Sequence, residues 1–271
     1  MSPCLIRRLT PDDLKPVDYN ADSLAAAAQY EPADGVYTAA NTFNTFQVLK
    51  LDAHLDRLED SAQREQIPLV LDRQRLRAAL RTMIAESGFG SVRYRITVPR
   101  PANELILTIE PFQPPSMQMY EQGVRCVTLP ESAQRVNPAS KTTDWVHERE
   151  RFVLPPGIYT GLLLNAAGDI LEGMSSNFYA VLDGELRTAG TGILPGISQQ
   201  IVFTVAPEVL PVRQEAVNRR DLSRLSEAFV TSSSRGIMPV VEIDNIRIGA
   251  GVPGPQTRAL RQVHGAWVEK H

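Results

Sequence analysis

The spacing of apolar residues predicts that helices and strands alternate in the first part of the chain. Leu55, Leu58 and Ala62 recur at helical intervals within residues 52–65, and Asp52 is of a type that begins helices. A second amphipathic pattern predicts a helix over residues 72–86 that ends at Gly88. The remaining elements predicted here are a short alanine helix over 25–28 and strands over 36–38, 42–49, 92–98 and 104–110.

Short strands dominate the second part of the chain. They are predicted over 124–129, 158–165, 174–182, 185–188, 227–231 and 237–243, with helices over 142–152, 197–206 and 255–269. Turn residues at 167–169 and 183–184 suggest hairpins, so a mostly antiparallel sheet or barrel is expected. A dinucleotide-binding fold is disfavoured because no Gly-x-Gly-x-x-Gly run follows a strand.

A proline-rich segment without a regular pattern, residues 111–123, is the best candidate for a linker. It divides the chain into a small α+β domain over 1–113, a linker over 114–120 and a larger domain over 121–271. The predicted fold class is therefore α+β with two domains.

Composition narrows the function further. The chain of 271 residues carries 28 Lys+Arg and 31 Asp+Glu, a net charge of −3 that argues against a large basic surface for nucleic acid. Two cysteines and four scattered histidines exclude a disulfide framework and a Cys/His zinc cluster, so no metal is expected. The N-terminus lacks an apolar signal region, and Pro and Gly interrupt the longest uncharged runs. We expect a cytoplasmic protein without a membrane partner.

Four separate segments carry polar residues that indicate a function only when they are considered together. They are HLDRL over 54–58, Lys141 after a Pro-Ala-Ser run, Glu172-Gly173 before Ser176 and Asn177, and the turns 194–198 and 231–235. Taken singly, each has an ordinary interpretation, such as an arginine on a solvated helix face or a lysine at a helix start. Together they supply what a pyridoxal-phosphate enzyme needs: an amine, an acid for the ring nitrogen, and phosphate donors from an arginine and a helix N-terminus.

The order and local sequence of these places resemble the class IV aminotransferases, the fold-type-IV pyridoxal-phosphate enzymes. That family includes D-amino-acid transaminases, branched-chain aminotransferases and 4-amino-4-deoxychorismate lyases. The resemblance runs from residue 34 to the C-terminal helix. Its most specific pieces are HLDRL over 54–58, Lys141 with EG at 172–173, SNFY over 176–179, LPGIS over 194–198 and EAFVTSSSRGIMPV over 227–240.

The resemblance implies pyridoxal 5′-phosphate as the cofactor and assigns a role to each motif. Lys141 matches the lysine that forms the Schiff base and then moves the substrate proton, and Glu172 matches the carboxylate beside the pyridine nitrogen. Arg57 matches the phosphate-binding arginine, while Ile197 and Ser198 match backbone donors at a helix N-terminus. By the same match, Ser176, Asn177 and Ser233 contact the cofactor, Ser233 through its phosphate, and Tyr37 and the backbone of Ser234 contact the substrate.

Some family features are missing. The Arg-x-His pair that D-amino-acid transaminases use for the substrate carboxylate is absent. Arg93, Arg95 or Arg100 could replace it, because alternate residues of a strand share one face. The alternative is that these arginines lie on a solvent-facing strand. Gln199 also stands where relatives carry a basic residue.

The resemblance implies a small sandwich-like N-terminal domain, an antiparallel pseudo-barrel in the second domain, and a homodimer. The expected activity is amino-group transfer between an amino acid or amine and a 2-keto acid. An alternative is a 4-amino-4-deoxychorismate lyase that releases pyruvate and 4-aminobenzoate. A third interpretation is a cofactor-binding homologue that has lost turnover.

Overall fold

Two compact units make up the chain in the computed structural model, which describes residues 4–101 and 103–271. Unit 1 contains Met1–Gln113 and Ser140–Arg151, and unit 2 contains Pro114–Ala139 and Phe152–His271. Residues 140–151 were expected in the second domain but group with unit 1, and the expected linker over 114–120 groups with unit 2. A β-bridge between Val36 and Thr142 joins residues 140–151 to the first unit.

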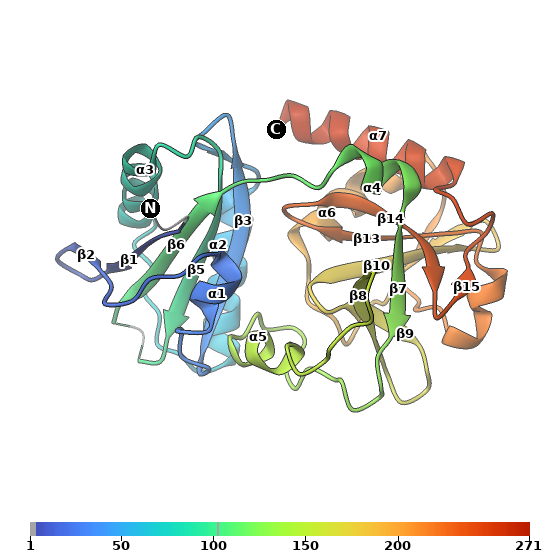
Figure 1. The fold of residues 1–271 in the computed structure, drawn as a ribbon, viewed down its shortest axis with the longest axis horizontal. Coiled ribbons are helices and arrows are strands. Elements are labelled where there is room, and N and C mark those ends of the chain that lie inside the picture. The colour runs from blue at the N-terminus through green and yellow to red at the C-terminus, as the bar shows by residue number, and fades with distance from the viewer. Residues whose placement is uncertain (1–3, 102) are drawn as a thin grey trace. The chain divides into compact units, whose positions relative to one another are not determined.

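An antiparallel six-stranded sheet forms the centre of unit 1, in the order β2-β1-β6-β5-β3-β4 (Figure 1). Two of these strands, β1 and β2, precede the first element that the apolar pattern predicts. They are short, and β1 has consecutive arginines in its centre, which hides the alternation of a strand. The strands are β1 (Leu5–Leu9), β2 (Leu14–Pro16), β3 (Gly35–Phe43), β4 (Gln47–Val48), β5 (Val92–Pro99) and β6 (Leu105–Pro111).

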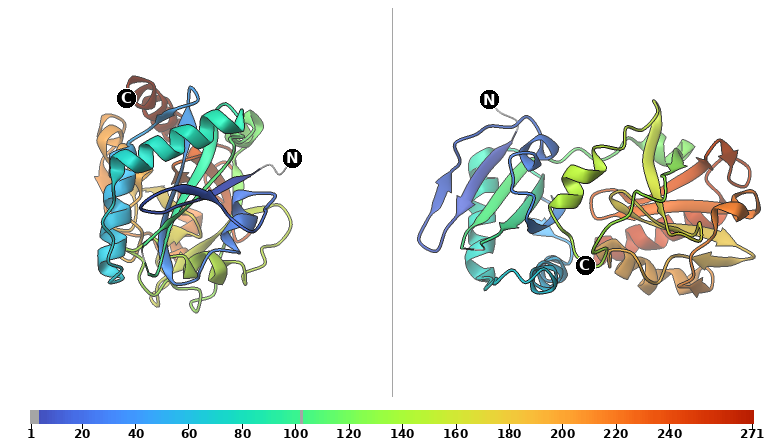
Figure 2. Two further views of the ribbon diagram at one scale, coloured as in Figure 1. Left: turned by 90° about the vertical axis from the view of Figure 1, so that its left-hand side faces the viewer. Right: turned by 90° about the horizontal axis from the view of Figure 1, so that it is seen from below.

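Helices cover both faces of this sheet. The helices α2 (Leu51–Arg64) and α3 (Arg73–Ser87) lie against one face of the sheet (Figure 2). They share an apolar core with alternate β5 residues such as Tyr94 and Ile96. On the other face, Tyr37 packs with α1 (Leu24–Ala28) and with Val146 of α5 (Asp144–Arg149). Because strand residues alternate between faces, Arg95 lies on the face of β5 opposite Tyr94 and Ile96.

A closed barrel of six strands forms the centre of unit 2. Pairing runs in a ring through β10, β13, β14, β7, β8 and β9 and returns to β10, with parallel pairing only at β14–β7 and β7–β8. The α+β class and the mostly antiparallel pseudo-barrel are thereby confirmed. The ring consists of β7 (Val124–Thr128), β8 (Ile158–Leu164), β9 (Ile170–Gly173), β10 (Ser176–Leu182), β13 (Glu227–Ser232) and β14 (Gly236–Ile243).

Alternating side chains of β10 fill the barrel and support the helices outside it. Phe178 and Ala180 belong to the interior cluster, whereas Tyr179 and Val181 pack with residues of α6 (Ile197–Val205) and α7 (Pro255–Lys270). The other elements of unit 2 are α4 (Met117–Gln122), β11 (Glu185–Arg187), β12 (Val212–Arg213), β15 (Ile246–Arg247) and the 3₁₀ turns Ala206–Glu208 and Arg219–Arg224. No helix in the described part of the chain has the length and apolar composition needed to cross a membrane.

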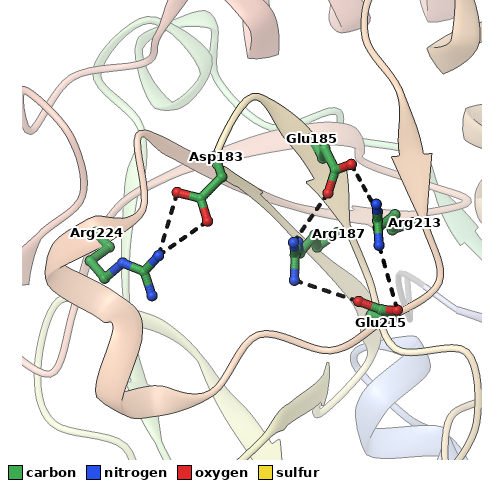
Figure 3. Close-up of polar contacts among 6 residues, drawn as sticks. All are labelled: Asp183, Glu185, Arg187, Arg213, Glu215 and Arg224. Carbon is green, nitrogen blue, oxygen red and sulfur yellow. Dashed lines mark hydrogen bonds and ion pairs between the residues drawn. The ribbon is translucent and has the colours of Figure 1, made fainter.

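Ion pairs cover the edge of the sheet beyond the barrel. Arg187 of β11 and Arg213 of β12 are direct neighbours in register, and Glu185 and Glu215 lie between them (Figure 3). The four charges alternate, so the two arginines do not face each other uncompensated. Such a charged edge protects a short strand such as β12 from pairing with another chain.

A buried carboxylate holds the first turn of α7. Glu227, 7% exposed, accepts hydrogen bonds from the backbone N–H groups of Gln256 at 2.9 Å and Thr257 at 2.6 Å. A Cβ atom at Gly254 would overlap Cδ of Glu227, so only glycine fits there. The carboxylate thus satisfies donors that every helix N-terminus leaves open.

Glu227→Gln should lower the free energy of unfolding by about 1–3 kcal/mol, because an amide has one acceptor oxygen for two buried donors. Glu215→Gln is the matched control, since Glu215 is 60% exposed, and it should change stability by less than about 0.5 kcal/mol. Urea denaturation followed by circular dichroism measures both. Equal stability of the two variants would contradict the capping role.

Candidate active site

The main chain at Lys141 is fixed by unit 1. Its carbonyl oxygen accepts a hydrogen bond from the N–H of Tyr37 at 2.9 Å, and its own N–H donates to Oγ of Ser61 at 3.2 Å. Two residues later, the N–H of Thr143 donates to the carbonyl of Gly35 at 2.9 Å. The lysine therefore starts from a backbone held on both sides by β3 and α2.

Arg57 is joined to the same place through Ser61. Oγ of Ser61, which accepts from Lys141, donates to the carbonyl oxygen of Arg57 at 2.7 Å, one turn earlier on α2. The guanidinium of Arg57 reaches β3, where Nη2 lies 3.4 Å from Oγ1 of Thr38. Unit 1 thus brings together Lys141 and Arg57, which the sequence analysis selected from separate motifs.

His54 is buried beside these two cations. It is 1% exposed, and its Nδ1 lies 3.0 Å from Oγ1 of Thr38. Burial, followed by the charges of Arg57 and Lys141, lowers the pKa of His54 well below its usual 6.5.

Tyr37 contacts two cations. The guanidinium carbon of Arg95 lies 3.6 Å from the centre of its ring, and Nζ of Lys141 lies 4.6 Å from it. Arg95 is itself held in a buried ion pair, with Nη2 2.6 Å from Oε2 of Glu31, and Oγ1 of Thr97 donates to the same oxygen at 2.7 Å. The sequence analysis did not select Glu31, because nothing in its local sequence marks it.

The other two candidate arginines on or beside β5 also face carboxylates. Nη1 of Arg93 lies 3.5 Å from Glu110, and Nε of Arg100 lies 2.9 Å from Asp34. Arg93 and Arg100 are both substantially exposed, whereas Arg95, which shares a face of β5 with Arg93, is buried. Each arginine of the 91–100 segment that was considered for the substrate carboxylate therefore already has an acidic partner.

In unit 2, Glu172 is buried with both carboxylate oxygens engaged. Oε1 lies 3.0 Å from Nη1 of Arg135, and Oε2 accepts a hydrogen bond from the N–H of Leu194 at 3.2 Å. Both side chains of the pair are nearly inaccessible, at 6% and 5% exposure. Arg135 balances the charge of Glu172, and the sequence analysis missed it because it lies outside the selected motifs.

A row of polar residues crosses the barrel strands beside Glu172. Asn177 is the direct cross-strand partner of both Glu172 and Thr231. Its side-chain amide donates to the carbonyl of Leu194 at 2.9 Å, which joins the row to the turn before α6. Oγ of Ser176 is buried and makes no hydrogen bond within the described residues.

The N-terminus of α6 offers backbone donors next to this row. The N–H groups of Ile197 and Ser198 donate to no group in the described chain. Before them, Gly196 packs so closely that a Cβ atom would overlap Oδ1 of Asn177. Gln199 accepts from the N–H of Gly196 at 3.3 Å through Oε1 and so caps the helix.

Ser233 and Ser234 lie in the turn that joins β13 and β14. Arg235 holds this turn, because its Nε donates to Oγ of Ser232 at 2.7 Å and its Nη2 donates to the carbonyl of Ser175 at 3.0 Å. Ser175 lies in the neighbouring turn between β9 and β10. The two turns therefore lie side by side.

Each unit, taken by itself, carries donor groups of a kind that pyridoxal phosphate requires. Unit 1 offers the amine of Lys141 and the guanidinium of Arg57, which suit an aldehyde and a phosphate. Unit 2 offers a buried carboxylate for a protonated ring nitrogen, and unbonded N–H and hydroxyl groups for phosphate oxygens. Within the described residues, no group of three or more His, Cys, Asp or Glu could hold a metal ion.

Comparison with known proteins agrees with these features. A family model described as amino-transferase class IV matches residues 35–243. The D-alanine aminotransferase of Listeria monocytogenes serotype 4b is 26% identical over 256 residues, which cover 86% of each chain. The branched-chain-amino-acid aminotransferase of Pseudomonas aeruginosa is 24% identical over 253 residues, which cover 85% of this chain and 82% of the relative.

Solved structures share the fold. A branched-chain amino acid aminotransferase from T.th., complexed with N-(5′-phosphopyridoxyl)-L-glutamate, superposes with a TM-score of 0.80 at 21% identity, covering 97% of this chain and 94% of that one. The Escherichia coli branched-chain amino acid aminotransferase gives a TM-score of 0.74 at 22% identity, covering 96% and 93%. Since the family model matches most of the sequence, the chain belongs to the class IV aminotransferase family, the pyridoxal-phosphate-dependent enzymes that its motifs resemble.

Proposed function

We propose that this chain transfers an amino group between an amino acid or amine and a 2-keto acid, with Lys141 as the catalytic residue. Family membership supports the reaction class. The observation that carries the assignment of Lys141 is the Ser61 hydroxyl, which links the main chain of Lys141 to that of Arg57. An amine and a phosphate-binding cation are thereby held together in one unit.

When bound, pyridoxal phosphate supplies an aldehyde that joins an amine and a ring that withdraws electrons from the reacting carbon. Nζ of Lys141 would hold that aldehyde until the amino donor binds. Nζ then accepts the proton from Cα of the donor, a task that requires a neutral amine.

Glu172 is proposed to accept a hydrogen bond from the protonated ring nitrogen. Its two fixed contacts, with Arg135 and with the N–H of Leu194, orient the carboxylate in advance. Arg135 also offsets the cost of burying the negative charge.

The phosphate is proposed to bind Arg57, the N–H groups of Ile197 and Ser198, and the hydroxyl of Ser233. The free donors at the start of α6 and the helix dipole favour a dianion at that end. Ser176 and Asn177 are proposed to line the cofactor side of the barrel, and Tyr37 and Ser234 the substrate side. We also propose a homodimer, the assembly that the family resemblance implies, which light scattering during gel filtration would test.

Amino transfer should require both a donor and an added 2-keto acid when the holoenzyme is assayed by chromatography of the new amino acid. Lys141→Ala should reduce the rate by at least about 10³-fold, because the proton acceptor is lost. Lys15→Ala, an exposed lysine of β2, should leave the rate unchanged. Release of pyruvate from aminodeoxychorismate without an acceptor would favour the lyase instead, and bound cofactor without turnover of any donor would refute both enzyme assignments.

Arg57→Gln should weaken binding of pyridoxal phosphate by about 10–100-fold, the effect of losing a hydrogen bond from a charged donor to phosphate. Arg64→Gln is the matched control, because Arg64 lies on the same helix and is exposed. Titration of the cofactor-free proteins, followed by absorbance, gives both dissociation constants. If the two variants bind equally well, Arg57 does not hold the phosphate.

Stability should fall as the pH drops below about 6.5. Folding lowers the pKa of His54, so below pH 6.5 this side chain binds a proton in the unfolded chain but not in the folded chain. The free energy of unfolding should therefore decrease by up to about 1.4 kcal/mol per pH unit for this group. His54→Asn should flatten the slope between pH 7.5 and 5.5 in urea denaturation, and an unchanged slope would contradict a neutral buried His54.

A further inference from the structure

The arginines of the β5 segment are poorly suited to bind a substrate carboxylate. Arg95 has its charge balanced by Glu31 at 2.6 Å, and both side chains are 4% exposed or less. Arg93 and Arg100 lie beside Glu110 and Asp34. A substrate carboxylate would have to compete for each of these arginines with a carboxylate of the same chain.

Arg235 differs because its partners are neutral. Its Nε donates to Oγ of Ser232 at 2.7 Å, and its Nη2 donates to both the carbonyl and Oγ of Ser175 at 3.0 Å. No carboxylate of the described chain lies within 4.0 Å of it, and its Nη1 donates no hydrogen bond to the described residues. The side chain is partly exposed. It therefore keeps its full charge and a free edge of the guanidinium.

These contacts also place Arg235 at a defined end of the barrel. Ser175 follows β9, the strand that carries Glu172, and precedes β10, the strand that carries Asn177. Arg235 itself directly follows Ser234. The guanidinium also lies 5.4 Å from the ring centre of Tyr159, which restricts its movement further. The guanidinium of Arg235 therefore lies between two turns that are next to residues of the candidate site.

We propose that Arg235 binds a carboxylate of the amino donor and of the keto acid, an inference that rests on the proposed function. Hydrogen bonds to neutral oxygens orient a guanidinium without cancelling its charge, and its planar fork matches a carboxylate. The chain lacks the Arg-x-His pair, and Arg235 supplies the missing cation from a different strand pair. The bound carboxylate is either the one attached to the reacting carbon or one at the far end of the substrate. Comparing a keto acid that has one carboxylate with a keto acid that has two separates these cases.

The test compares Arg235→Gln with the matched control Arg220→Gln, an exposed arginine of unit 2. In the holoenzyme, Arg235→Gln should raise the KM for pyruvate and for 2-oxoglutarate by about 10–100-fold, with kcat within a few-fold. An increase for both acids assigns the carboxylate beside the reacting carbon, and an increase for 2-oxoglutarate alone assigns the distal one. The KM for an amine donor without a carboxylate should not change.

A second readout does not depend on turnover. Binding of propionate and succinate to the holoprotein, followed by the cofactor absorbance, should weaken by about 10–100-fold in Arg235→Gln and less in Arg235→Lys, which keeps the charge. Affinity for pyridoxal phosphate should stay unchanged. Suppose that the wild type transfers amino groups. If Arg235→Gln then keeps its carboxylate affinity, or loses affinity for pyridoxal phosphate to the same extent, the role of Arg235 is refuted while the proposed function stands. If wild type binds these acids through Arg235 but transfers no amino group, the proposed function fails instead.

Discussion

Backbone pairing between residues 141–143 and the start of β3 determines where the amine of Lys141 can lie. A lysine side chain has four rotatable bonds, so its amine is placed accurately only if its main chain is fixed. Here the N–H of Tyr37 and the carbonyl of Gly35 fix it through two hydrogen bonds of 2.9 Å. A side chain at Gly35 would come within 2.6 Å of the carbonyl of Val98, so the close approach requires glycine.

The same pairing concentrates positive charge in unit 1. Lys141 and Arg57 lie close enough to His54 that both disfavour its protonation. Cations in a partly buried place are costly unless an anion joins them. The Glu31–Arg95 pair shows one solution, in which the chain itself supplies the anion. Under the proposed function, the phosphate of the cofactor adds negative charge beside Lys141 and Arg57.

Local sequence was sufficient for elements whose apolar pattern is strong. The strand predicted over 174–182 corresponds to β10, the helical spacing over 52–65 predicted α2, and the run of short strands predicted the barrel of unit 2. The helix expected over 142–152 begins only at Asp144, because the residues before it pair with β3. Serine and arginine partners such as Ser61 and Arg135 were missed, since each acts through a contact with a residue tens of positions away.

The arginines show why residue type alone cannot assign a role. Arg95 and Arg235 are both arginines beside candidate site residues, and the sequence analysis considered only the first for the substrate. They differ in their partners. The carboxylate of Glu31 neutralises the charge of Arg95, whereas serine oxygens orient Arg235 and leave its charge unbalanced. A charge that has been neutralised within the fold contributes to stability, and a charge that has been oriented but left unbalanced remains available to a ligand. Only the folded chain decides between the two, because the partners come from distant strands.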